Sequence, residues 1–281
     1  MDTAISTKDV RLDRLTLHIL SAGSGPLAIC LHGITANAYV FEPLMMALAH
    51  RFHVVSIDMR GHGRSEKPAT GYSADDYADD IEALTTHFAD GPALLIGHAL
   101  GARDALVAGA RNNGLVAGVV AIDFTPFIEP GVFASLEQRI AGGDRLFAGG
   151  RALRAALQER YPLLPDDAIE RRAAHGYTAE GAALRPLADR SAMRETAAGL
   201  HRDIAPVLAS IAVPTLLIRG AASRFVSEDA WRRSQALRPD ITTIEIPGAD
   251  HYAAEEAPGP IAEAIIDFWR QSVAGPKTRT R

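Results

Sequence analysis

The stretch Leu94-Leu95-Ile96-Gly97-His98-Ala99-Leu100-Gly101 decides how the rest of the chain is interpreted. An apolar run typical of a buried strand leads into two glycines four positions apart, and residues 102–112 continue with helical spacing. Glycine tolerates crowded and left-handed backbone that other residues avoid. The pattern therefore predicts a sharp turn from a strand into a helix, with residue 99 at its tip. By themselves, the glycines would fit an ordinary strand–helix junction equally well.

On both sides of this turn, short apolar runs alternate with longer segments of helical period. Such alternation predicts an α/β fold with a mostly parallel sheet flanked by helices. The expected strands are residues 12–20, 27–31, 52–57, 93–96, 116–122, 215–219 and 241–246. The expected helices are residues 39–50, 74–88, 102–112, 227–237 and 260–269. Ser73 is expected to cap the helix over 74–88, with Asp76 in its first turn.

The segment from residue 127 to residue 206 follows a different pattern. It is rich in alanine and arginine, has amphipathic helical spacing and contains no convincing strand. We interpret it as a helical cap inserted into an α/β core that comprises residues 1–126 and 207–274. The basic, polar end at residues 275–281 is expected to be a disordered tail.

Composition and charge limit the class of protein. With 281 residues, 47% of them hydrophobic and 22% charged, the chain can fold as one large domain with an insertion. The net charge of −5 gives no electrostatic footprint for nucleic acid, which needs clustered positive charge, so we expect no nucleic-acid and no membrane partner. Residues 1–10 lack a signal-peptide pattern, and the single cysteine, Cys30, lies in an apolar run where we expect it to be buried. These features predict a cytoplasmic protein.

Three further motifs follow predicted strands. They are His32-Gly33-Ile34-Thr35, the segment 58–65 that begins Asp58-Met59-Arg60, and Gly248-Ala249-Asp250-His251. Ligand-binding loops gather at the carboxyl ends of strands in open α/β sheets. Together with the turn at Ala99, and in this order from residue 12 to residue 269, they resemble the α/β-hydrolase superfamily. The resemblance implies an α/β-hydrolase fold with the cap inserted after the sixth core strand.

The resemblance also assigns the acid and the base of a catalytic triad. His251 is the expected histidine, because it follows the last strand. The acid usually follows the strand at 215–219, but Ser223 stands there. Some members carry the acid after the preceding strand, so we assign Asp123 to orient His251, with a turn cap as its alternative role. Asp250 and Asp229 are the spare candidates.

The nucleophile position holds Ala99, which has no oxygen, so the chain as written cannot perform serine acyl transfer. The backbone N–H groups of Ile34 and Leu100 are the expected oxyanion hole. His32, His62 and His98 are interpreted as loop-supporting or packing residues. They have no metal-ligand spacing, so we expect no metal and no cofactor.

Several segments, among them residues 41–45, 77–81 and 121–126, are similar to a branch of the superfamily that acts in bacterial vitamin B6 degradation. This similarity implies hydrolysis of the enamide C–N bond of a small dicarboxylate such as (E)-2-(acetamidomethylene)succinate. It also implies that Arg139, Arg160 and Tyr161 contact the substrate carboxylates. The alternative for Arg139 and Arg160 is a position on a solvated face of a cap helix. For Arg171 and Arg172, which lie in the same segment, this solvated position is the favoured interpretation.

Three hypotheses account for Ala99. It replaces a serine in an otherwise intact hydrolase, which makes the chain an inactive variant. Alternatively, the chain is a non-catalytic relative that binds a ligand, or His251 and Asp123 work as a proton-abstracting dyad, as in cofactor-free dioxygenases or lyases. Hydrolysis of an ester or lactone is a further alternative, and the formation of a homodimer is left open.

Overall fold

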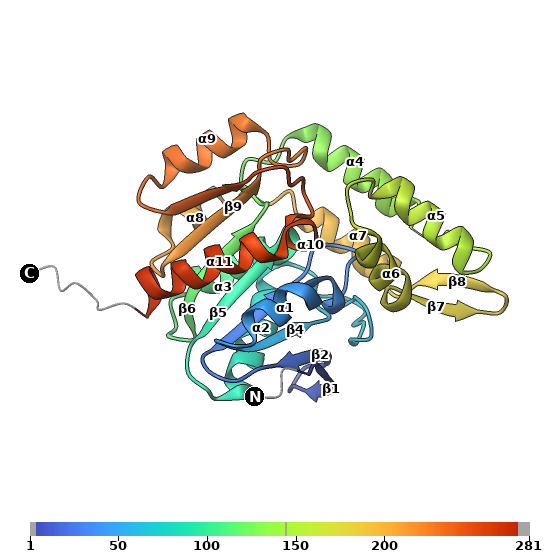
Figure 1. Ribbon diagram of the computed structural model, residues 1–281, viewed down its shortest axis with the longest axis horizontal. Coiled ribbons are helices and arrows are strands. Elements are labelled where there is room, and N and C mark those ends of the chain that lie inside the picture. The colour runs from blue at the N-terminus through green and yellow to red at the C-terminus, as the bar shows by residue number, and fades with distance from the viewer. Residues whose placement is uncertain (1–3, 144, 275–281) are drawn as a thin grey trace, which may run out of the picture.

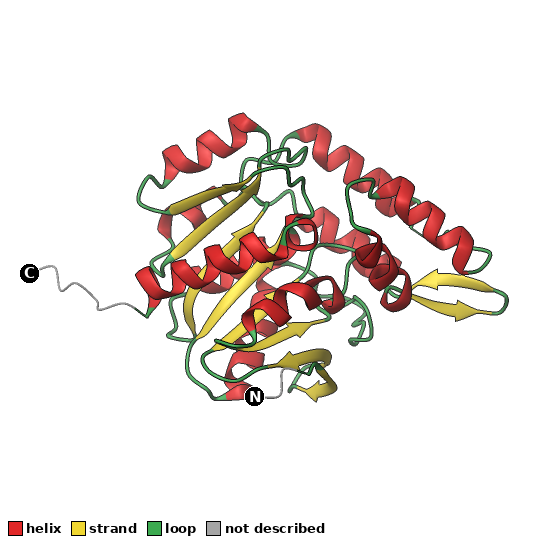
Figure 2. Ribbon diagram, viewed as in Figure 1, coloured by secondary structure: helices red, strands yellow, loops and turns green. Residues whose placement is uncertain are grey.

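The computed structural model describes residues 4–143 and 145–274, and its centre is one eight-stranded sheet (Figures 1 and 2). The strand order is β1-β2-β4-β3-β5-β6-β9-β10, with antiparallel pairing of β1 with β2 and β2 with β4, and parallel pairing elsewhere. The strands are β1 Ser6–Arg11, β2 Thr16–Ala22, β3 Leu27–Leu31, β4 His53–Ile57, β5 Ala93–His98, β6 Val116–Ile122, β9 Thr215–Gly220 and β10 Thr242–Ile246. The predicted α/β fold with a mostly parallel sheet is confirmed. The predicted tail at residues 275–281 lies outside the described residues.

The amino-terminal strands differ from the prediction. A single strand was expected over residues 12–20, but the chain forms β1 and β2 joined by a turn in which the Leu12 N–H donates to the Leu15 carbonyl at 2.9 Å. β1 is an edge strand and buries only Val10 among its six residues. It therefore lacks the alternating apolar pattern by which a strand is detected in sequence.

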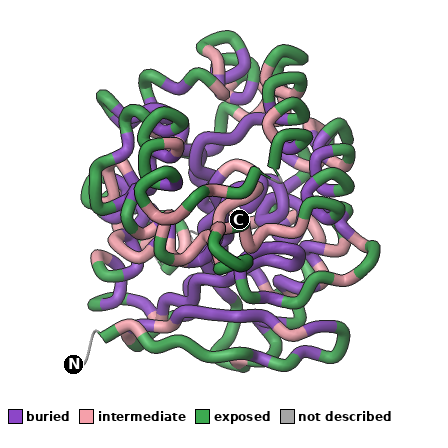
Figure 3. Tube along the Cα trace, turned by 90° about the vertical axis from the view of Figure 1, so that its right-hand side faces the viewer, coloured by how far each residue is buried: buried purple, intermediate pink, exposed green. Residues whose placement is uncertain are grey.

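Helices cover both faces of the sheet. Those of the core are η1 Ala38–Phe41, α1 Glu42–Leu48, α2 Ala74–Phe88, α3 Leu100–Ala110, α9 Glu228–Leu237, α10 Ala253–Glu256 and α11 Pro258–Phe268, with a last turn at Trp269–Val273. Leu44 of α1 and Ile265 of α11 pack in one apolar cluster, whereas Leu84 of α2 and Leu106 of α3 pack in another. Figure 3 shows that the middle of the sheet is buried and that exposed residues lie on the outer helices and loops. Cys30 in β3 is fully buried, as predicted, and burial raises the pKa of its thiol.

Most of the segment between β6 and β9 lies to one side of the sheet, whereas its last helix, Ala205–Ser210, packs against α3 of the core (Figure 1). The segment contains α4 Pro130–Ala141, α5 Gly150–Arg160, α6 Asp166–His175, β7 Tyr177–Glu180, β8 Ala183–Pro186, α7 Arg190–Gly199 and α8 Ala205–Ser210. The expectation of no strand here is wrong, because β7 and β8 form an antiparallel hairpin. Its strands have four residues each and none of them is fully buried, so their apolar signal is weak. α8 spans the predicted boundary at residue 206 and places Leu208 in the core, so the division into core and cap remains a prediction.

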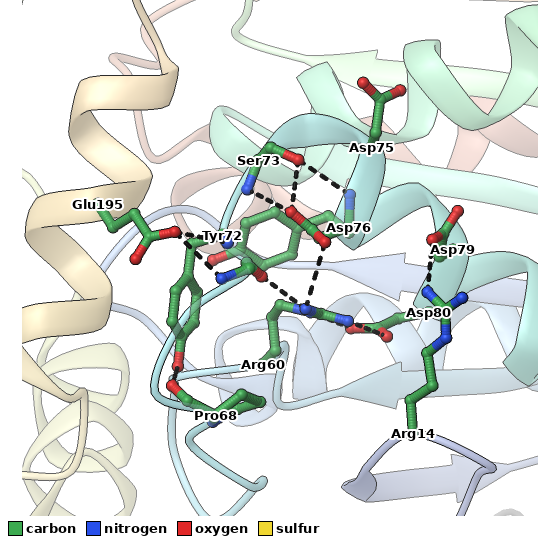
Figure 4. A network of polar contacts seen from close by, with 12 residues as sticks. Arg14, Arg60, Pro68, Tyr72, Ser73, Asp75, Asp76, Asp79, Asp80 and Glu195 are labelled. Atoms are coloured by element: carbon green, nitrogen blue, oxygen red, sulfur yellow. Dashed lines mark hydrogen bonds and ion pairs between the residues drawn. The ribbon is translucent and has the colours of Figure 1, made fainter.

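A polar network attaches this inserted segment to the core (Figure 4). Arg60, which follows β4, donates from Nε and Nη2 to the two carboxylate oxygens of Asp80 at 2.6 and 2.5 Å. Glu195 of α7 accepts hydrogen bonds from the N–H groups of Gly71 and Tyr72 at 3.1 and 3.2 Å. The network therefore holds α7 against the loop that precedes α2.

The start of α2 is capped as predicted. Ser73 accepts from the Asp76 N–H at 3.3 Å, and Asp76 Oδ2 accepts from the Ser73 N–H at 2.9 Å, which is a capping box. Within residues 4–143 and 145–274, none of the helices has the length and apolar character that crossing a membrane requires.

Candidate active site

The predicted sharp turn between β5 and α3 is present, and Ala99 stands at its tip. Ala99 has φ 49° and ψ −108°, a conformation that alanine rarely adopts, and its N–H donates to the Ile122 carbonyl at 3.0 Å. A side chain at position 97 would overlap the backbone of Gly101, and one at position 101 would overlap the carbonyl of Leu31. The fold thus requires both glycines, and it holds residue 99 in a strained conformation above the sheet.

The structure brings His251 and Asp123 together. His251 lies on the loop after β10, and its Nδ1 is 2.7 Å from Oδ2 of Asp123, which directly follows β6. Asp123 Oδ1 accepts from the Gly220 N–H at 3.0 Å, and Oδ2 accepts from the Ser223 hydroxyl at 2.7 Å. Both Asp123 and His251 are buried. Ser223, at the place where the superfamily usually carries its acid, therefore supports the acid that stands here.

Sequence reasoning missed this contribution of Ser223, because it noted only that no acid was present there. The Ser223 hydroxyl also accepts from the N–H of Val226 at 3.0 Å, which fixes its direction. The signal that could have found it is the pairing of an acid after β6 with a short hydroxyl side chain after β9. A hydroxyl after β9 can fill the space that a carboxylate would occupy there, and it can donate a hydrogen bond to the carboxylate that follows β6.

Burial controls the protonation of the pair. Burial and the positive charge of Arg139 together lower the pKa of His251 to about 3. Burial raises the pKa of Asp123, whereas the hydrogen bonds from Ser223 and Gly220 oppose that rise. The His251 ring is therefore neutral near pH 7, with Nδ1–H donating to Asp123 and Nε2 left as a proton acceptor.

The remaining acids and histidines have supporting positions. Asp250 accepts from the N–H and Nε of Arg224 at 3.0 and 2.9 Å, and Asp229 is exposed in the first turn of α9, so neither orients His251. His98 Nε2 lies 2.8 Å from the His251 carbonyl. His32 lies with Nδ1 2.8 Å from the Gly33 carbonyl, and its Nε2 accepts from the Met59 N–H at 3.0 Å. His62 is fully buried, with Nδ1 2.9 Å from the Arg60 carbonyl.

Two backbone N–H groups, which were predicted to form an oxyanion hole, belong to residues that line the cavity at Ala99. In the part of the chain that the structure describes, neither the Ile34 N–H nor the Leu100 N–H has a hydrogen-bond acceptor. Leu100 is the first residue of α3, where the helix dipole adds positive potential. Ile34, Ala99, Leu100 and His251 all line one cavity with a volume of about 60 Å³.

A second cavity, with a volume of about 70 Å³, contains the predicted carboxylate contacts. Arg139, Arg160 and Tyr161 line it together with Arg172. Arg139 Nη1 lies 3.5 Å from the Tyr252 hydroxyl, and its Nε is buried without a partner among the described residues. The structure thus gathers cations and a phenol from α4, α5 and α6 in one place, as carboxylate binding would require.

The interpretation of Arg171 and Arg172 as solvated helix faces is wrong. Arg172 is buried, forms an ion pair with Glu255 through Nη2, and lies 4.4 and 5.0 Å above the rings of Tyr161 and Tyr252. The side chain of Arg171 is only 14% exposed and pairs with Asp167 at 2.6 Å. Helical spacing could not reveal this, because the partner of Arg172 lies on α10, far along the chain.

Comparison with known proteins agrees with this geometry. A family model described as alpha/beta hydrolase fold matches residues 26–258. The chain belongs to the alpha/beta-hydrolase fold family. The 2-(acetamidomethylene)succinate hydrolase of Mesorhizobium japonicum is 47% identical to this family member over 262 residues, which are 93% of this chain and 94% of that protein. The crystal structure of E-2-(acetamidomethylene)succinate hydrolase superposes with a TM-score of 0.92 at 46% identity, covering 94% of this chain and 99% of the other.

A more distant relative is similar over most of its length. Haloalkane dehalogenase 2 of Mycobacterium tuberculosis is 29% identical over 269 residues, covering 89% of this α/β hydrolase and 90% of the dehalogenase. The match of the family model confirms the family predicted from the turn at Ala99 and the three loop motifs.

Proposed function

We propose that this chain has the site of a hydrolase for the amide C–N bond of small N-acylated dicarboxylates, such as (E)-2-(acetamidomethylene)succinate, with Ala99 in place of the nucleophile. The observation that carries the proposal is the His251–Asp123 pair, 2.7 Å apart, in the cavity that Ala99 lines. The 47% identity to 2-(acetamidomethylene)succinate hydrolase supports the choice of substrate class.

The chemistry can be followed for an Ala99→Ser variant. Neutral His251 accepts the hydroxyl proton at Nε2 while the oxygen attacks the acyl carbon. The N–H groups of Ile34 and Leu100 stabilise the oxyanion, each contributing roughly 3 kcal/mol in the transition state. His251 then gives the proton to the departing nitrogen, and water, activated by the same ring, hydrolyses the acyl-enzyme.

The substrate carboxylates belong in the cationic cavity. Arg139 and Arg160 offer planar donor pairs that match a carboxylate, and Tyr161 adds a hydroxyl. A dianion held there would place its N-acyl group toward the cavity that Ala99 lines. Removing either arginine should weaken substrate binding, and unchanged affinity in both Arg139→Ala and Arg160→Ala would contradict this assignment.

With Ala99, the chain keeps the binding groups and the base but has no hydroxyl to form an acyl-enzyme. We therefore expect it to bind the substrate without hydrolysing it. The proposal treats Ala99 as the replacement of a serine in an otherwise intact hydrolase site. The His251–Asp123 dyad and the non-catalytic binder are outcomes of the test that follows.

The test compares the Ala99 chain with Ala99→Ser and with Ala99→Gly, which also lacks a hydroxyl. Calorimetry measures binding of (E)-2-(acetamidomethylene)succinate, and acetate release measures hydrolysis. The expected result is binding by all three proteins and hydrolysis by Ala99→Ser only. Binding without hydrolysis in Ala99→Ser would favour the non-catalytic relative, and turnover by the Ala99 chain that His251→Ala abolishes would favour the dyad.

A further inference from the structure

The cavity at Ala99 has an apolar side. Beyond the reacting groups it is lined by hydrocarbon side chains, namely Ile128, Val132, Phe133, Leu136, Leu200, Phe124, Phe225 and Val226. Its polar lining side chains, among the described residues, are Asp123, Thr125 and His251. These three already have partners, because Asp123 pairs with His251 and the Thr125 hydroxyl lies 2.8 Å from that of Ser234. This part of the cavity offers nothing to a carboxylate and suits an apolar group.

The oxyanion site fixes which part of a substrate reaches this space. An acyl carbonyl bound by the Ile34 and Leu100 N–H groups has one substituent on each side of its carbon. If the dicarboxylate half lies with Arg139 and Arg160, the acyl chain lies on the other side, against Phe133 and Leu200. We propose that this apolar cavity is an acyl pocket built for unbranched chains longer than acetyl. The inference rests on the proposed function and deepens it.

The volume of the pocket indicates how long an acyl chain it can hold. Its volume is about 60 Å³, measured as the space open to the centres of water-sized groups. The space that such groups fill is larger than the space open to their centres, and one water-sized group fills roughly 10–15 Å³, so the pocket holds at least about four of them. An acetyl group occupies two or three of these places with its carbonyl and methyl. The remaining space therefore admits a chain longer than acetyl, such as a butanoyl group.

Side chains of the inserted segment form the far wall. Ile128, Phe133 and Leu200 line the acyl pocket and also a second cleft on the other side. Ile128 and Phe133 are only partly buried. These side chains therefore bound the pocket on that side, and substitutions there should change its depth without disturbing the sheet.

The test uses the chain as it stands, with Ala99, so that binding is measured without hydrolysis. Calorimetry compares the acetyl, propanoyl, butanoyl and hexanoyl forms of (E)-2-(acylaminomethylene)succinate. Each buried methylene should tighten binding about fourfold, up to butanoyl. Affinity that is equal along the series, or highest for acetyl, would overturn the acyl pocket.

Two variants test whether this cavity causes the dependence of affinity on acyl-chain length. Leu136→Phe fills the pocket and should reverse the order, with acetyl then bound at least as tightly as butanoyl. Leu146→Phe makes the same change at a side chain that is 51% exposed and lines neither cavity, and it should leave the order unchanged. A reversal in both variants, or in neither, would contradict the assignment. The affinities of the unsubstituted chain test the proposal even if Leu136→Phe does not fold.

The same series separates this inference from the function on which it rests. If acetyl binds and longer chains do not bind more tightly, the acyl pocket is wrong and the proposed function stands. If no member of the series binds, the proposed function is wrong and the acyl pocket falls with it.

Discussion

At the scale of single residues, Ala99 shows that the backbone conformation of the turn does not depend on a reactive side chain. Ala99 keeps the strained backbone of the turn, at φ 49°, although its side chain cannot react. Such a conformation costs roughly 1–3 kcal/mol, and the fold maintains it through the close approach of Gly97 and Gly101 to the backbone around them. The strained turn is thus maintained around a side chain that cannot react.

The pH dependence of hydrolysis reports on His251. Burial lowers the pKa of His251 from 6.5 to about 3, so the ring stays neutral, and able to accept a proton, in mildly acidic solution. Burial also raises the pKa of Asp123 to about 7, so the pair takes up its first proton on the carboxyl and its second, at much lower pH, on the ring. For Ala99→Ser, kcat/KM should therefore fall in two acid steps, one near pH 7 and one well below pH 6.5. A pH–rate profile measures this. A single acid step near pH 6.5 would contradict the burial argument.

Ser223 is a positioning residue for the acid. Its hydroxyl donates to Asp123 Oδ2 at 2.7 Å, and a hydrogen bond to a charged group contributes roughly 1.5–3 kcal/mol. Placing Ser223→Ala in the Ala99→Ser background should lower kcat at least about tenfold and change KM little. Ser227→Ala, which removes the cap of α9 nearby, is the control and should leave kcat unchanged. Equal rates for Ser223→Ala and its parent would exclude this role.

At the scale of elements, the prediction from sequence was correct where the local pattern sets the structure. The apolar run before Gly97 and the helical spacing after it were sufficient to predict β5, α3 and the turn between them. Asp123 was predicted from the absence of an acid at Ser223. The hairpin β7–β8 and strand β1 were missed because their residues are largely exposed, which removes the apolar alternation.

Arg172 shows what a local pattern cannot predict. The Arg172–Glu255 ion pair joins α6 to α10 and is buried, whereas Asp167, the partner of Arg171, is 67% exposed. Glu255→Gln leaves a buried guanidinium with a weaker partner and should lower the free energy of unfolding by up to about 3–5 kcal/mol. Asp167→Asn, at the neighbouring arginine, should cost about 1 kcal/mol or less. Denaturant unfolding measures both variants, and equal losses in the free energy of unfolding for Glu255→Gln and Asp167→Asn would contradict the distinction between the buried and the exposed ion pair.

At the scale of the whole molecule, buried histidines connect stability to pH. Burial lowers the pKa of His32 to about 4 and that of His62, His98 and His251 to about 3. Between pH 6.5 and about 4 the unfolded chain therefore binds more protons than the folded chain, so the free energy of unfolding falls as the pH falls.

The size of this loss can be measured at pH 7 and pH 5.5. Each of these histidines should contribute up to about 1.4 kcal/mol for one pH unit below its ordinary value. Burial raises the pKa of Asp104 and of Asp123 to about 7, so the protonation of these two carboxyls in the folded chain offsets part of the loss. Urea unfolding should still show a lower midpoint at pH 5.5, because four histidines oppose two carboxyls, and recovery after return to pH 7. A midpoint that is equal or higher at pH 5.5 would contradict this balance.

The net charge of the molecule does not describe how charge is distributed within it. The net charge of −5 predicts no partner that requires a basic surface, whereas the cavity lined by Arg139, Arg160 and Arg172 concentrates positive charge where the proposed dianion would bind. A cytoplasmic location, the absence of a metal ion or cofactor, and the state of assembly stay predictions.

The central claim is that this α/β-hydrolase site lacks only the nucleophilic oxygen. Intact-mass measurement of Ala99→Ser, mixed with (E)-2-(acetamidomethylene)succinate and quenched during the first turnover, tests it most directly. The account predicts one covalent acetyl group on the protein, at the introduced hydroxyl, and none on the Ala99 chain or on Ala99→Ser combined with His251→Ala. Release of acetate by Ala99→Ser without such an adduct, or an adduct that persists without His251, would contradict it.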